Sequence, residues 1–216
     1  MGQQDIGTGR QPGIPFIKVT RHIGQRIVGG LVDEEQRQQY TWRKENGKPV
    51  RGELAFKENG KPLLELVLTL VVMPGTSATM IDEDGVEVVP EPGTVVRHSI
   101  DGFKWGQYIK ARDLLGKDNN PRTGDLFART YVHASIADGS ENRTILATEA
   151  DIAAVPRDVN IRKDMEILVR RPGPEHTAIV EQCNAKRAEL AQQPVGASVG
   201  GAPAGGGYNP ATDDPF

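Results

Sequence analysis

The chain has 216 residues and a formal net charge of −3, with 26 lysines and arginines against 29 aspartates and glutamates. This balance excludes a protein coated with positive charge, although a local basic face can still be offset by acids elsewhere. Hydrophobic residues make up 37%, a share that predicts one folded domain with appendages. The single cysteine, Cys183, excludes an intramolecular disulfide and gives no reason to expect an oxidising compartment.

The first 24 residues are polar and rich in glycine and proline. We interpret 1–24 as a loose arm, with IPFIKV as a candidate short strand. The arm lacks the apolar stretch of a secretory signal. The longest apolar run of the chain, LLELVLTLVVM, is interrupted by Glu65 and is too short to span a bilayer. The sequence therefore predicts a cytoplasmic protein with no membrane partner.

Strand signals begin with QRIVGGLV, a short apolar run whose two glycines are typical of a bent strand. The motif KENGKP then occurs at 44–49 and again at 57–62, and each Asn-Gly pair favours a two-residue hairpin turn. Residues 50–56 alternate between the two faces of a strand, and LELVLTLVV is apolar enough for a buried strand. We therefore expect 38–73 to form a three-stranded antiparallel meander.

A helix is expected between later strands. The segment TVVRHSI is typical of a strand, and 103–115 has a loose helical face that stops at Gly116. Two more strands are expected at DLFARTYVHASI and ENRTILATEADIA. This order predicts an all-β fold with one or two helices, a small antiparallel barrel of the OB-fold kind. We assign 25–172 to this barrel domain, 173–193 to a C-terminal helix and 194–216 to a flexible linker.

The strand at 125–136 has two distinct faces. One face carries Phe127, Arg129, Tyr131 and His133, and the other carries Leu126, Ala128, Thr130, Val132 and Ala134. Because the second set is small and largely apolar, we expect it to fill the barrel and the first set to face solvent. An exposed row of aromatic and basic side chains suits single-stranded nucleic acid, since bases stack on rings and cations meet phosphates. The alternative is that Phe127 and Tyr131 are core residues beneath the helix, with Arg129 extending its charged end to the surface.

A similar row occurs in QQYTWRK, where Tyr40, Trp42 and Lys44 share a face beside Arg43. It is a second candidate contact surface for bases and phosphates. The alternative is a hairpin whose aromatic residues pack on the neighbouring strand. The short strand between the two rows carries Arg97 and His98, which would extend the surface if the strands are adjacent.

Catalytic and metal-binding patterns are weak. The four histidines are far apart, and none has zinc-ligand spacing with Cys183. The acids at 82–84 lack the ligand ladder of a calcium loop, and GTGRQPG lacks the Lys-Ser/Thr of a phosphate-binding loop. We expect no enzyme activity, no cofactor and no metal, although an enzyme with scattered active-site residues stays open.

The segment GGGYNPATDDPF closes the sequence with a glycine run and an acidic tip, Asp213, Asp214, Pro215 and Phe216. A barrel core, a flexible linker and this tip together resemble the single-stranded DNA-binding proteins of bacteria. In that family the tip docks on replication, recombination and repair enzymes, which implies that Phe216 fills an apolar pocket while the carboxylates meet basic residues.

The resemblance covers the tip and the layout but not the core. Bacterial members begin with a strand almost at residue one and have a richer acidic tip. The chain therefore resembles a divergent, phage-encoded member of the family that acts in the cytoplasm of a bacterial host. The implied function is to bind and protect single-stranded DNA without strong sequence preference. The DNA-binding residues expected from the two rows and the strand between them are Tyr40, Trp42, Arg43, Lys44, Arg97, Phe127, Arg129 and Tyr131.

Two other functions stay open. In a protein-interaction or virion-associated β-barrel, the aromatic rows would be protein contacts. A recombination mediator would bind a recombinase and little DNA itself. Formation of a homo-oligomer is also left open.

Overall fold

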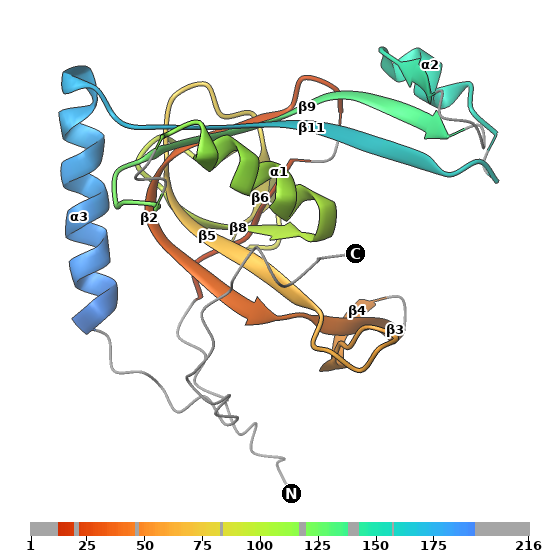
Figure 1. Ribbon diagram of the computed structural model, residues 1–216, viewed down its shortest axis with the longest axis horizontal. Helices are drawn as coiled ribbons and strands as arrows, with labels where there is room; N and C mark the ends of the chain where they lie inside the picture. The colour runs from red at the N-terminus through yellow and green to blue at the C-terminus, as the bar shows by residue number, and fades with distance from the viewer. Residues whose placement is uncertain are drawn as a thin grey trace, which may run out of the picture.

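The computed structural model describes residues 13–19, 22–45, 48–82, 84–116, 120–137, 143–156 and 158–192. Within these ranges the protein is mostly β, with antiparallel sheets and three α-helices (Figure 1). The predicted all-β class is therefore confirmed. None of the described helices is long and apolar enough to cross a membrane.

The largest sheet has the strand order β10-β9-β2-β5-β8, and β11 pairs with the other edge of β9. Its strands are β2 (Arg26–Gln38), β5 (Leu64–Val72), β8 (Val95–Asp101), β9 (Leu126–Ala137), β10 (Arg143–Leu146) and β11 (Ile161–Arg170). All of these pairs are antiparallel. No ladder joins β8 to β11 in the described part of the chain, so the sheet does not close into a barrel.

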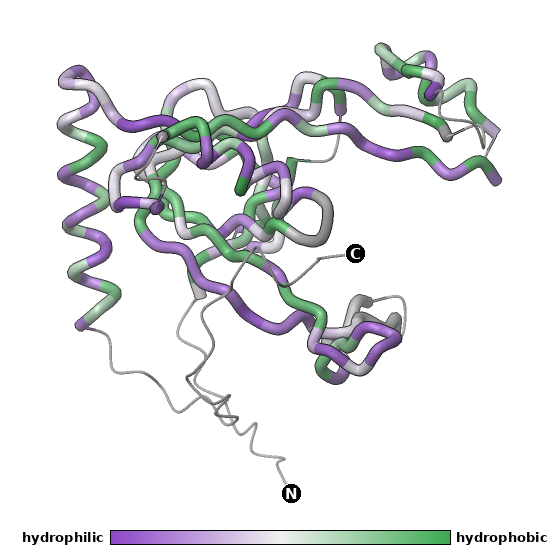
Figure 2. The backbone as a smooth tube through the Cα atoms, viewed as in Figure 1, coloured by the Kyte–Doolittle hydropathy of each residue, from purple (hydrophilic) through white to green (hydrophobic). Residues whose placement is uncertain are grey.

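The predicted meander is only partly correct. The first Asn-Gly repeat lies between β3 (Tyr40–Glu45) and β4 (Lys48–Leu54), which pair with each other as expected. The third strand, β5, pairs with β2 and β8 instead of β4. The reason is hydrophobic burial, because β5 is buried at every residue from 66 to 72 and needs a strand on either side. Figure 2 shows the hydrophobic β5 beside the hydrophilic second half of β2.

Two further elements differ from the sequence prediction. Strand β11 was not predicted, because its charged residues, Lys163 among them, interrupt the apolar alternation. The strand predicted at ENRTILATEADIA ends at Leu146 and is followed by helix α2 (Glu149–Ala153). Thr148 and Asp151 form a capping box that begins this helix.

The first half of β9 turns toward the core the face that was predicted to meet solvent, since Phe127, Arg129 and Tyr131 are buried. Helix α1 (Gly102–Asp113) covers this half, and its Tyr108 ring lies 6.1 Å from the Phe127 ring. The expectation that this aromatic row faces solvent was therefore wrong, and the alternative of a core row beneath the helix holds for Phe127 and Tyr131. Arg129, which that alternative placed with its charged end at the surface, is buried.

The pairing of β9 with β11 then skips Val132, which was assigned to the interior and is exposed. Two residues of the predicted interior face, Leu126 and Ala134, are buried as expected.

Part of the expected N-terminal arm belongs to the core. Strand β1 (Ile17–Lys18) pairs with β6 (Thr79–Ile81), which pairs with β7 (Glu87–Val88). Ile17 and Val19 are buried in the main hydrophobic cluster. The candidate short strand in IPFIKV is therefore confirmed as β1, although this segment is packed on the core instead of lying in a loose arm. Residues 1–12 lie outside the described part.

Helix α3 (Thr177–Gln192) follows a short 3-10 turn at Pro174–His176 and confirms the predicted C-terminal helix. It packs against β2 and β5, where Cys183 joins Val32 and Val71 in a second cluster. A Cβ atom at Gly30 would lie 2.7 Å from the Cys183 Sγ, so the close approach of the helix needs glycine there. Burial raises the pKa of the Cys183 thiol to about 11. Cys183 is thus a packing residue.

Candidate nucleic-acid interface

The connection between β2 and β5 leaves the core as a projecting hairpin (Figure 1). Three backbone hydrogen bonds hold its base. The Gln39 amide donates to the Leu63 carbonyl at 2.7 Å, the Ala55 amide donates to the Gln39 carbonyl at 2.9 Å, and the Leu63 amide donates to the Ala55 carbonyl at 2.9 Å. These bonds fix where the hairpin leaves the sheet. Residues 40–62 are called the basic hairpin below.

The basic hairpin concentrates positive charge in an acidic protein. It contains six basic residues against three glutamates, which gives it a net charge of about +3 in a chain of net charge −3. The basic residues are Arg43, Lys44, Lys48, Arg51, Lys57 and Lys61. Three aromatic residues, Tyr40, Trp42 and Phe56, are interleaved with them. Clustered cations and aromatic rings in one projecting element are the chemistry that suits a nucleic-acid strand.

The backbone register of β3 and β4 places an aromatic residue opposite a basic one. Trp42 pairs with Arg51 and Lys44 pairs with Pro49, with a register shift between Tyr40 and Trp42. Tyr40 is half-buried. The side chains of Trp42, Arg43 and Lys44 lie outside the described part of the structure, so their predicted exposure stays a prediction.

The second Asn-Gly repeat forms a tight turn near the C-terminal end of the basic hairpin. The Gly60 amide donates to the Lys57 carbonyl at 2.9 Å, and Gly60 has a φ of +77°, which favours glycine. This turn exposes Lys57 and Lys61. Phe56, just before it, is 58% exposed. The sequence analysis missed Phe56 as a site residue, because alternation assigned 50–56 to a strand. The position of Phe56 beside the lysine turn was the available signal.

A second projection is formed by β9, β10 and β11 beyond Arg26, the first residue of β2, on the same side of the core as the basic hairpin in Figure 1. On this arm the Asp164 carboxylate lies 3.1 Å from Arg162 Nε and 4.0 Å from Arg143 Nη1. His133 Nε2 lies 3.6 Å from the same carboxylate, and Ser135 donates to it at 2.5 Å. One carboxylate therefore orders several half-exposed basic groups on the arm.

Arg129 forms a buried polar pair with His98. Arg129 Nη1 lies 2.8 Å from His98 Nε2, and because arginine can only donate, Nε2 is the acceptor. The hydrogen of the ring is then on Nδ1, which donates to the Ile17 carbonyl at 3.2 Å. Burial, with the Arg129 charge as the second cause, lowers the pKa of His98 to about 3. Arg129 and His98 are therefore core residues that cannot meet phosphate directly.

The structure does not bring the two predicted rows together. One row lies on the projecting hairpin, and Phe127, Arg129 and Tyr131 lie inside the core. Arg97 is half-buried on β8, and its backbone amide donates to the Pro15 carbonyl at 2.8 Å. The candidate interface is therefore the basic hairpin and the arm.

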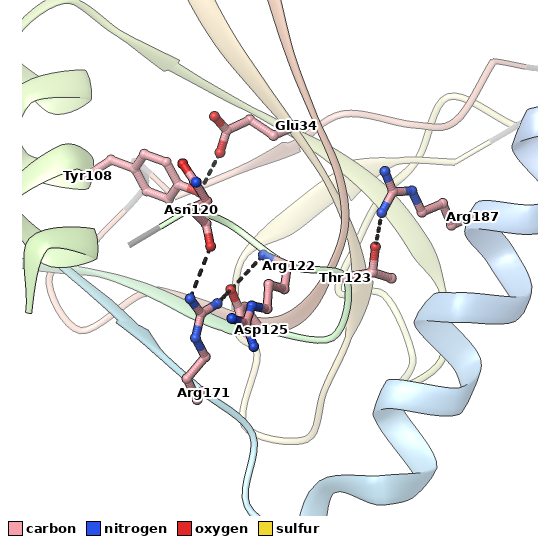
Figure 3. Close-up of polar contacts among 8 residues, drawn as sticks. All are labelled: Glu34, Tyr108, Asn120, Arg122, Thr123, Asp125, Arg171 and Arg187. Atoms are coloured by element: carbon pink, nitrogen blue, oxygen red, sulfur yellow. Dashed lines mark hydrogen bonds and ion pairs between the residues drawn. The ribbon is translucent and has the colours of Figure 1, made fainter. Parts of the chain in front are cut away.

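Figure 3 shows the contacts that hold the loop before β9. The Asp125 carboxylate accepts from the Arg122 amide at 2.8 Å and from Arg171 Nη1 at 2.5 Å. Arg187 of α3 donates to Thr123 Oγ1 at 2.6 Å. These bonds tie the end of β11 and helix α3 to the loop, so the cations here already have structural partners.

Helix α1 is tied to the extended strand that supports the hairpin. The Tyr108 hydroxyl donates to the Glu34 carboxylate of β2 at 2.7 Å, and Arg112 Nη1 lies 3.4 Å from the same carboxylate (Figure 3 shows the Tyr108 contact). Burial raises the pKa of Tyr108 well above its usual value. The tyrosine therefore stays a neutral donor that fixes α1 against β2.

No family model, curated protein or solved structure matches this chain. Among the described residues, no group of three or more histidine, cysteine, aspartate or glutamate side chains could hold a metal ion. The docking tip expected at Asp213, Asp214, Pro215 and Phe216 lies outside the described residues. Any functional assignment therefore depends on the chain's own fold and chemistry.

Proposed function

We propose that the protein binds single-stranded DNA without catalysing a reaction, on an OB-like framework. Strands β2, β5 and β8, helix α1, and strands β9 and β11 follow one another in the order of the OB plan. The first of these strands pairs with the second and the fourth, and the remaining pairs are second with third and fourth with fifth. This connectivity supports the OB-like interpretation.

The basic hairpin carries the proposal. It is the connection between the first and second OB strands, one of the two connections with which OB-folds hold oligonucleotides. Its exposed Phe56 offers a face on which a base can stack, and Lys57 and Lys61 beside it can meet phosphates. Such stacking depends little on base identity, so the proposed binding has weak sequence preference.

The arm supplies the other connection, between the fourth and fifth OB strands. Its half-exposed Arg143 and Arg162 are held around Asp164, which keeps guanidinium groups in place for a DNA backbone. In this proposal a strand of DNA contacts the basic hairpin and continues toward the arm. No cofactor is involved, and the proposed place of action is the cytoplasm, that of a bacterial host for a phage-encoded protein.

Replacing Phe56 with alanine is expected to weaken binding of labelled oligo-dT by roughly 1–3 kcal/mol, the contribution of one stacked base. Trp42→Ala is expected to have an effect of the same size. Fluorescence anisotropy at fixed salt measures both. Leu114→Ala is the matched control, because Leu114 is an exposed apolar residue just after α1, and it should bind like the unchanged protein. Equal affinity of the Phe56→Ala and Leu114→Ala proteins would remove Phe56 from the site.

We also propose that the acidic tip recruits replication, recombination or repair proteins, on the resemblance of Asp213, Asp214, Pro215 and Phe216 to the tip of bacterial relatives. Phe216→Ala is expected to abolish capture of such proteins from a bacterial lysate while leaving oligo-dT affinity and melting temperature unchanged. Tyr208→Ala, an aromatic change in the same segment, is the control and should retain capture. Capture of the same proteins by the Phe216→Ala protein would contradict the docking role.

A further inference from the structure

The hairpin of β6 and β7 has the opposite character to the basic hairpin. Residues 79–92, called the acidic hairpin below, contain five carboxylates and no lysine or arginine. Three of its apolar side chains, Ile81, Val86 and Val89, are each at least half exposed, at 53%, 55% and 50%. Apolar side chains gathered on one short, charged element are typical of a contact surface.

Hydrogen bonds join the described residues of the turn in the acidic hairpin. Asp82 Oδ1 accepts from the Asp84 amide at 3.1 Å and from the Val86 amide at 2.7 Å. Gly85 completes the turn with a φ of +80°. The exposed Asp84 side chain lies on this turn, and the exposed Glu91 begins another, in which the Thr94 amide donates to the Glu91 carbonyl at 3.1 Å. Backbone hydrogen bonds of this kind lower the entropy cost of forming a contact.

Strand directions place the two hairpins at different ends of the molecule. Strand β6 is antiparallel to β1, the bridge from Phe16 to β8 is parallel, and β8 is antiparallel to β5. It follows that β6 runs in the direction of β5. The basic hairpin lies before the first residue of β5, so the turn of the acidic hairpin points away from it. The two surfaces are therefore placed to meet between copies.

We propose that the acidic hairpin of one copy docks on the basic hairpin of a second copy. Charge complementarity carries this choice of partner, because five carboxylates face an element of net charge about +3. Each surface also offers exposed apolar groups, Phe56 and Leu54 on one side and the three apolar residues on the other. Because the two surfaces differ, the contact is heterologous and joins copies head to tail.

This contact occupies the same Phe56, Lys57 and Lys61 that the proposed function assigns to DNA, and to that extent it depends on the proposed function. Single-stranded DNA and the acidic hairpin then compete for one surface. Self-association is the state of the DNA-free protein, and a DNA strand releases it by covering the lysines.

Sedimentation velocity of the full chain without DNA tests the contact. The unchanged protein is expected to associate with rising concentration at low salt and to become monomeric at high salt, because salt screens exposed charges. The double variants Lys57→Glu/Lys61→Glu and Asp84→Lys/Glu91→Lys should each associate roughly tenfold more weakly. Lys110→Glu, an exposed change on α1, should associate like the unchanged protein.

Mixing the two double variants is the decisive experiment. The Lys57→Glu/Lys61→Glu protein keeps the original acidic hairpin, and the Asp84→Lys/Glu91→Lys protein keeps the original basic hairpin. In the mixture these two unchanged surfaces can meet, so pairs of unlike copies should form with the affinity of the original contact. A monomeric unchanged protein at low salt, association that persists in either variant alone, or a mixture that stays monomeric would each overturn the proposal.

Adding oligo-dT separates this proposal from the proposed function. If both are correct, oligo-dT dissociates the assemblies, and Asp84→Lys/Glu91→Lys binds oligo-dT several-fold more tightly than the unchanged protein at low salt. If association follows the charge reversals but oligo-dT does not bind, the self-contact stands and the proposed DNA function fails. If oligo-dT binds to a protein that never associates, the proposed function stands and the self-contact fails.

Discussion

Replacing Phe127 with alanine is expected to lower the free energy of unfolding by about 3–5 kcal/mol, the usual range for a buried aromatic residue. Phe127 is 2% exposed, and its ring lies 6.1 Å from the Tyr108 ring and 5.9 Å from the His98 ring. Its removal leaves a cavity between α1 and the sheet that the surrounding side chains cannot fill completely. Denaturant unfolding followed by circular dichroism measures the change.

Phe56→Ala is the matched control, since it removes the same ring from an exposed position. That change should alter the free energy of unfolding by no more than about 0.5 kcal/mol. The two variants should therefore have opposite effects. Phe127→Ala should lose stability, and Phe56→Ala should lose DNA affinity. A stable Phe127→Ala protein with weakened DNA binding would restore the sequence-based assignment of Phe127 to the interface.

Acidification is expected to destabilise the fold through His98. The pKa of His98 in the folded protein is about 3, against 6.5 for an ordinary histidine. Because the folded state disfavours the proton, His98 contributes stability that is fully present above pH 6.5. That stability is lost as the pH falls toward 3, at about 1.4 kcal/mol per pH unit. The protonated ring would also face the Arg129 guanidinium at 2.8 Å.

Denaturant unfolding at several pH values below 6.5 measures this loss. His98→Gln removes the titrating ring but can still accept from Arg129, so its free energy of unfolding should fall less steeply with pH. His22→Gln, a change at an exposed histidine, should keep the steep dependence. Parallel curves for the His98→Gln and unchanged proteins would show that His98 is not the group responsible.

Local patterns predicted most of the strands and both longer helices, because alternation and turn residues act over a few positions. The orientation of β9 could not be predicted in the same way. Arg129 between two aromatic residues suggested solvent, yet its partner His98 lies 31 residues away on β8. A buried polar pair of this kind depends on tertiary structure, which periodicity does not report.

The sequence predicted where the candidate site lies but not all of its residues. The basic and aromatic composition around Trp42 identified the hairpin that the structure shows projecting from the core. Phe56 was missed because alternation assigned it to a strand, whereas it is followed by a turn that leaves it exposed. Strand β11 was missed because Lys163 interrupts the alternation of Ile161 and Met165, the side chains that pack on the core.

The proposed function has an OB-like framework that presents the basic hairpin to single-stranded DNA. Anisotropy of labelled oligo-dT, competed by unlabelled single strand or by duplex at equal phosphate concentration and at several salt concentrations, tests it most directly. We expect single strand to compete far better than duplex and affinity to fall steeply with salt, because phosphate contacts release counterions. Equal competition by duplex, or an affinity that does not change with salt, would contradict it.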